Sequence, residues 1–169
     1  MVEMWIAGVS LGLFAAACAF LATGATLLGK GSPKEAGFVQ IFVGFFQTIA
    51  IFITVSEGIP YAPQMLFMFA IVWFTFGFAN ITGRGLEPLM WGTCPVGGLF
   101  YTLDFFYELS CGAYTWAGCA LAWAILFWLF VPPIFSKAGA KAIGWYISIL
   151  GIVADFIPAW LLIMGIPLP

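Results

Sequence analysis

The stretch Lys30–Gly44 reads KGSPKEAGFVQIFVG, and a related stretch, KAGAKAIGWYISILG, occupies Lys137–Gly151. In both, a lysine stands four residues after the first lysine, a glycine seven after it, an aromatic residue eight after it and a glycine fourteen after it. A fainter copy begins at Arg84, with Trp91 one place early and Gly98 at the last position. A repeat with a nearly fixed period predicts that each copy belongs to one supersecondary unit.

The composition indicates that nearly the whole chain lies in lipid. Hydrophobic residues make up 64% of the 169 residues and charged residues 7%, whereas a soluble domain carries roughly a quarter charged residues. The hydrophobic runs exceed the roughly 18 residues that a bilayer span needs. No segment shows the alternation of apolar and polar residues that a membrane barrel requires. We therefore expect an all-α integral membrane protein.

Six transmembrane helices are expected in a single domain over residues 1–169. Pro132-Pro133 should break or bend the fifth helix near its end, and Pro95 should kink the fourth, while Pro158 lies inside the sixth. Each copy of the repeat falls between two helices, so the bundle consists of three repeated helical hairpins. The expected helices run from about 4–28, 36–56, 64–81, 89–107, 114–135 and 142–164.

The basic residues predict the orientation of these hairpins. All of them fall in the first, third and fifth turns, and cytoplasmic loops are the ones enriched in lysine and arginine. This places both termini outside and makes the hairpins parallel repeats about an axis along the membrane normal. A central path would then be ringed by equivalent residues of the first, third and fifth helices. The basic residues are Lys30, Lys34, Arg84, Lys137 and Lys141.

The repeat also predicts two layers of side chains around that path. Ten residues before each basic start lie Phe20, Phe74 and Phe127, and fourteen before it lie Ala16, Ala70 and Trp123. A narrow slot lined by such rings admits a small flat neutral molecule. It excludes hydrated ions, which would lose their water with nothing to replace it. The alternative is that these aromatic residues pack the core of the bundle or face lipid.

Few polar residues lie inside the expected spans. Asp155 is the acid expected to lie well inside one of them, and an intramembrane carboxylate is a functional hypothesis by default. The alternative is an acid near the outer surface that is hydrogen-bonded to threonine or tryptophan. Thr23 and Asn80 lie near the inner ends of the first and third helices.

The sequence gives no indication of an enzyme. It has no histidine, no Walker A loop and no G-x-S-x-G motif, and its four cysteines form no C-x-x-C pair. We therefore expect no metal site, no cofactor and no nucleic-acid partner.

Four segments, in order and at these spacings, resemble the AmiS/UreI family of bacterial urea and short-chain amide channels. The resemblance covers most of the chain, and the last of the segments is the most specific. The segments are Ser32-Pro-Lys-Glu35 with Ile41-Phe-Val-Gly44, Trp73-Phe-Thr-Phe-Gly-Phe-Ala-Asn80, the stretch from Trp116 to Trp128, and Ile157-Pro-Ala-Trp-Leu-Leu162.

The resemblance implies a six-helix protomer with its own urea-sized pore in the bacterial cytoplasmic (inner) membrane. It implies a ring of six such protomers around central lipid. The constrictions of the family match the same two layers that the repeat predicts. Passage would be passive, with urea or a small aliphatic amide sliding against aromatic faces.

Two departures from the family bear on gating and substrate. The acid-gated members carry periplasmic histidines and a longer second turn, both missing here, so acid gating of that kind is not expected. Those members also carry a glutamate in the sixth helix, where this chain has Leu150. Two aromatic positions are smaller here, which would widen one layer for acetamide-sized substrates.

Two other functions are weighed against the channel. The first is a secondary transporter or channel for another small solute, such as ammonia or a short carboxylic acid, that uses Asp155. The second is a structural membrane protein without transport.

Overall fold

The computed structural model describes residues 4–58, 62–166 and 168, which form helices, the turns between them and a short stretch after the last helix. Two segments are π-helical, η1 and η2, and the remainder of the helical residues are α-helical. The elements in chain order are α1 (Met4–Leu27), α2 (Pro33–Ser56), α3 (Ala62–Thr82), η1 (Leu89–Thr93), α4 (Cys94–Ser110), α5 (Tyr114–Leu129), α6 (Pro132–Ala138), α7 (Ala140–Leu150), η2 (Gly151–Phe156) and α8 (Ile157–Ile163).

The helices have the length and apolar character of membrane spans. Among the described residues, four helical stretches are long and apolar enough to cross a bilayer. A fifth is added if the bent pair α5 and α6 counts as one span. The protein is therefore an all-helical, multi-pass membrane protein.

Prolines divide three of the expected helices. The expected helix 114–135 consists of α5 and α6, which meet at an angle of 93° beside Pro132 and Pro133. The expected helices 89–107 and 142–164 contain the π-helical segments η1 and η2, which come shortly before Pro95 and Pro158. A proline removes a backbone N–H and clashes with the preceding turn, so the chain bends or widens there.

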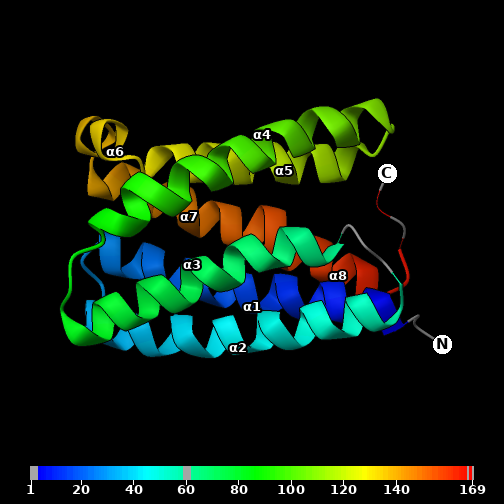
Figure 1. Cartoon of the computed structure of the whole chain (residues 1–169), viewed down its shortest axis with the longest axis horizontal. Coiled ribbons are helices and arrows are strands. Elements are labelled where there is room, and N and C mark those ends of the chain that lie inside the picture. Colours follow the sequence, from blue (N-terminus) through cyan, green and yellow to red (C-terminus); the bar gives the residue numbers. More distant parts are fainter. Residues whose placement is uncertain (1–3, 59–61, 167, 169) are drawn as a thin grey trace.

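The two ends of the bundle differ in charge (Figure 1). The turns after α1 and α3 and the short helix α6 lie at one end, which carries all five basic residues. The start of α1, the end of α8 and the turn between α4 and α5 lie at the other end. Asp104 and Glu108 lie on the last turns of α4 and are both buried. We call these the basic end and the acidic end.

Glycines allow two pairs of helices to approach closely. A Cβ atom on Gly77 of α3 would lie 2.8 Å from the carbonyl oxygen of Gly37 on α2. A Cβ atom on Gly24 of α1 would lie 2.9 Å from the carbonyl oxygen of Gly144 on α7. Gly37 and Gly144 are the repeat glycines seven residues after Lys30 and Lys137. Small residues at such crossings let membrane helices pack backbone to backbone, which gives these repeat positions a structural reason.

Candidate functional site: two cavities joined by an aromatic waist

Three cavities follow one another from the acidic end to the basic end. The acidic-end cavity has a volume of about 160 Å³ and the basic-end cavity about 190 Å³. Between them lies a cavity of only about 20 Å³, which is about the space that one water molecule needs. The small cavity shares Phe69 with the first and Thr23, Phe76 and Phe130 with the last. We call it the waist.

Phe69 of α3 is the central ring of the waist. Its centroid lies 5.5 Å from those of Phe20, Trp123 and Phe127, and 5.3 Å from that of Tyr101. All five side chains are at least 97% buried. Most of these contacts are edge-to-face or tilted, arrangements that aromatic pairs prefer to a face-to-face sandwich. Buried rings from α1, α3, α4 and α5 therefore pack around Phe69 at the waist.

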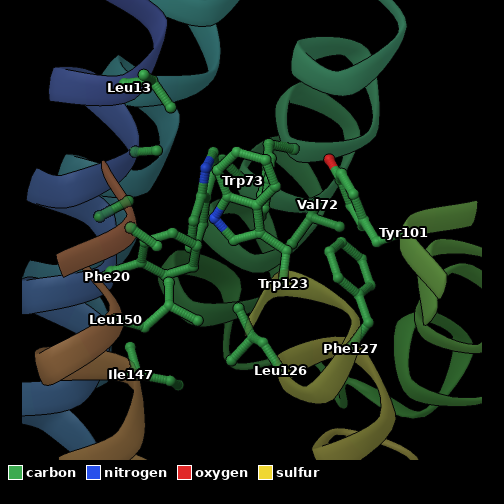
Figure 2. Close-up of a cluster of buried hydrophobic side chains, with 14 of the residues drawn as sticks. Leu13, Phe20, Val72, Trp73, Tyr101, Trp123, Leu126, Phe127, Ile147 and Leu150 are labelled. Atoms are coloured by element: carbon green, nitrogen blue, oxygen red, sulfur yellow. The ribbon is translucent and has the colours of Figure 1, made fainter. Parts of the chain in front are cut away.

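The structure brings together two of the three repeat phenylalanines. Phe20 and Phe127 both line the waist. Phe74 does not: it is half-buried, and its ring packs edge-on against Phe45 of α2 at 5.1 Å. Trp73, the preceding residue, lines the waist in its place, with its ring 4.9 Å from that of Phe20. Figure 2 shows Phe20 at the left of this cluster, Phe127 with Tyr101 at the right, and Trp73 between them.

The three repeat phenylalanines have another property in common: each packs against a glycine of a neighbouring hairpin. The nearest neighbours of Gly44 on α2 include the ring of Phe74, and those of Gly97 on α4 include the ring of Phe127. Gly151 in η2 has the Cβ atom of Phe20 as its nearest neighbour. The repeat therefore reflects the packing of neighbouring hairpins against one another. This packing does not require that all three rings face the waist.

The three residues of the second predicted layer do not line one cavity together either. Ala16 and Trp123 line the acidic-end cavity, whereas Ala70 is buried and lines none of the three cavities described here. Phe69, directly before Ala70, is the α3 residue that lines both the acidic-end cavity and the waist. Leu150 is buried in the hydrophobic cluster beside Phe20 and does not line these cavities.

Sequence reasoning missed Phe69, Trp73 and Tyr101. A signal for the first two was present, because the second copy of the repeat carries its aromatic residue, Trp91, one place early. Counting that copy from Gly83 instead of Arg84 gives Trp73 ten residues back and Phe69 fourteen back. The hydroxyl group of Tyr101 donates to the carbonyl oxygen of Met65 at 2.7 Å, which holds its ring against the waist.

Asp155 is fully buried and lines the acidic-end cavity together with Glu108. The indole N–H of Trp123 donates to its Oδ2 atom at 3.5 Å, a tryptophan partner of the kind weighed in the sequence analysis. Asp155 lies in η2, and a π-helical turn holds one residue more than an α-helical turn would. We attribute the inward position of Asp155 to this extra residue.

The basic-end cavity contains a chain of hydrogen bonds across three helices. Asn80 of α3 donates to the side-chain oxygen of Gln40 on α2 at 2.9 Å, and Gln40 donates to the hydroxyl oxygen of Thr23 on α1 at 2.8 Å. Thr23 donates in turn to the carbonyl oxygen of Ala19 at 2.7 Å. Gln40 is fully buried at the centre of the chain. Both predicted polar residues, Thr23 and Asn80, therefore line this cavity and are linked through Gln40, which was not among the predicted site residues.

Replacing Gln40 with methionine should lower the free energy of unfolding by about 1–3 kcal/mol, because polar groups of its partners lose their hydrogen bonds inside the protein. Thermal unfolding in detergent would measure the change. Thr26→Val is the matched control, since the Thr26 hydroxyl donates only within its own helix, to the carbonyl oxygen of Ala22. Equal melting temperatures for the two variants would show that the chain of hydrogen bonds adds no stability.

Comparison with known proteins shows to which family this chain is similar. Residues 9–166 match the family described as AmiS/UreI family transporter. The chain is 26% identical over 164 residues to a Mycolicibacterium smegmatis protein named as an amidate substrates transporter, and the alignment covers 92% of this chain and 76% of that protein.

Two solved structures share the fold. The crystal structure of the urea channel from Helicobacter pylori matches with a TM-score of 0.82 and 20% identity, over 93% of this chain and 98% of that one. The cryoEM structure of the Helicobacter pylori urea channel in a closed state matches with a TM-score of 0.79 and 19% identity, over 92% and 97%.

Proposed function

The chain belongs to the AmiS/UreI family of transporters, and from this premise we propose that it is a passive channel for urea or small aliphatic amides. The observation that carries the proposal is the aromatic waist between two cavities of a single protomer. A flat neutral amide can pass between ring faces, whereas an ion would have to shed its water into a site that offers no replacement. The printed names of the relatives above support the same substrate class.

We propose six crossings for this channel. The joined segments η1 and α4 supply one, and α7, η2 and α8 together supply another. The basic end would be cytoplasmic because all five basic residues lie there. Both termini would then be outside, in the bacterial inner membrane.

The proposed assembly is a homohexamer around central lipid, as the family resemblance implies. In support, α2 exposes a row of large apolar side chains that could face lipid or neighbouring protomers: Phe38, Phe42, Phe45, Phe46, Ile49 and Phe52.

A carrier of a short carboxylic acid is not favoured. Asp155 and Glu108 both line the acidic-end cavity, so an entering carboxylate would meet two acidic side chains. None of the five basic residues lies at that end to offset them.

Stopped-flow measurements on proteoliposomes test the channel. Urea, formamide and acetamide should cross faster than in vesicles without protein, and glycerol should not. A passive channel for neutral solutes should give the same urea permeability with and without an imposed membrane potential or proton gradient. Equal permeation of all four solutes with and without protein would refute the proposal, and uptake that follows the proton gradient would favour the carrier.

A further inference from the structure

Gln47 of α2 lines the acidic-end cavity and carries a side-chain oxygen without a hydrogen-bond partner among the described residues. Its side chain is fully buried, and its amide N–H donates to the carbonyl oxygen of Gly12 on α1 at 3.3 Å. That hydrogen bond fixes which way the amide points. The other atom of the amide, Oε1, finds no partner among the described residues.

Asp155 lines the same cavity and carries a second oxygen without a partner among the described residues. Its Oδ2 atom is held by the indole N–H of Trp123, and its Oδ1 atom has no partner in the described part of the chain. Gln47 and Asp155 belong to different hairpins, yet both line the acidic-end cavity next to the waist. Their two orientations are set independently, one by the α1 backbone and one by Trp123.

Two buried oxygens without partners are costly. An unsatisfied buried acceptor loses the hydrogen bonds that water gave it, and native structures contain few such groups. The cavity they line, at about 160 Å³, has room for a small molecule in place of water. A molecule that brings N–H groups to these oxygens would satisfy both.

We propose that Gln47 and Asp155 form a selectivity site that binds the NH₂ groups of urea and primary amides before they enter the waist. This inference rests on the proposed channel function and adds the basis for its choice among neutral solutes. The waist selects by size and flatness, and the site selects by the number of N–H donors. Glu108 lines the same cavity and is a third side chain with acceptor oxygens. The described residues that line this cavity include no lysine or arginine.

Three isomeric amides of equal heavy-atom count separate the two kinds of selection. Propionamide has two N–H donors, N-methylacetamide has one, and N,N-dimethylformamide has none. Each is used to compete with the influx of labelled urea into proteoliposomes. We expect propionamide to inhibit at a concentration about tenfold lower than N,N-dimethylformamide, with N-methylacetamide between them, as expected for one or two net hydrogen bonds.

Two variants test whether Gln47 and Asp155 cause this order of inhibition. Gln47→Met keeps the length of the side chain and removes its oxygen. Asp155→Asn replaces one carboxylate oxygen with an NH₂ group. Because the indole N–H of Trp123 needs an acceptor, the remaining oxygen of the amide should face Trp123, and the NH₂ group, which is a donor, should take the position of the free oxygen. In both variants the spread among the isomers should fall to about threefold or less, from the loss of one hydrogen bond. Thr48→Val is the matched control, because the Thr48 hydroxyl donates to the Gly44 carbonyl oxygen of its own helix and lies outside the cavity.

The outcomes separate this inference from the channel function. Urea influx with equal inhibition by the three isomers would overturn the selectivity site and leave the channel standing. A spread that survives in both variants would also overturn it. No urea influx above that of vesicles without protein would instead remove the proposed function on which the site rests.

Discussion

Replacing Phe69 with alanine is expected to raise the permeability of propionamide relative to urea by roughly tenfold, because one methylene group of fit in an apolar pocket is worth about that much. Phe69 is the ring that contacts Phe20, Tyr101, Trp123 and Phe127 at once, and it lines both the waist and the acidic-end cavity. Removing it joins those two spaces and ends the size limit between them. Stopped-flow permeabilities of the two solutes give the ratio directly.

Phe74→Ala is the matched control for this variant. It removes the same ring from the same helix, at the position that the repeat by itself selects for the pore. Since Phe74 packs against α2 and not in the waist, its loss should lower stability while the ratio of propionamide to urea permeability stays unchanged. The opposite result, with selectivity lost in Phe74→Ala and kept in Phe69→Ala, would mean that the path follows the repeat and not the three cavities.

Replacing Gly77 with valine should destabilise the fold by about 3 kcal/mol, the upper part of the usual range for overpacking. The first added carbon alone would lie 2.6 Å from the side chain of Ile41 and 2.8 Å from the carbonyl oxygen of Gly37. Because the second contact is with backbone, the two helices would have to move apart. Thermal unfolding of the purified protein in detergent would report the loss.

Gly118→Val controls for placing a β-branched residue in a membrane helix. Gly118 is exposed on α5, and nothing lies within 4 Å of the position that its Cβ atom would take. Its substitution should change the melting temperature little. If Gly77→Val unfolds no earlier than Gly118→Val, then the close approach of α2 and α3 is not needed for stability.

Most of the helical framework could be predicted from the sequence. Residues 4–28 and 64–81 correspond to α1 and α3 within two residues at each end. In both cases a long apolar run ends at residues that favour a turn, and the placement of this run in the bilayer determines where the helix begins and ends. The second helix begins three residues before the expected residue 36, because Ser32 and Glu35 form a capping box that starts the helix at Pro33.

The helices that contain proline were less predictable. Pro132 and Pro133 indicated a break, and the structure has one, but its angle of 93° depends on how α6 packs beyond the break. Pro95 indicated a kink and Pro158 lies inside the sixth expected helix, but the sequence did not show that π-helical turns would come before these prolines. Such a turn inserts one residue, and therefore changes which side chains face inward beyond it.

By itself the sequence determined the membrane class, the spacing of the hairpins and the gathering of all basic residues at one end. These properties follow from composition and from period, which do not depend on contacts between distant residues. Only the tertiary structure decided which aromatic residues meet. Helix α3, which crosses α2 closely at Gly37 and Gly77, presents Phe69 and Trp73 to the waist and Phe74 to α2. One residue of register is 100° of rotation on a helix, so a repeat that fits to within one residue cannot specify the lining of a pore.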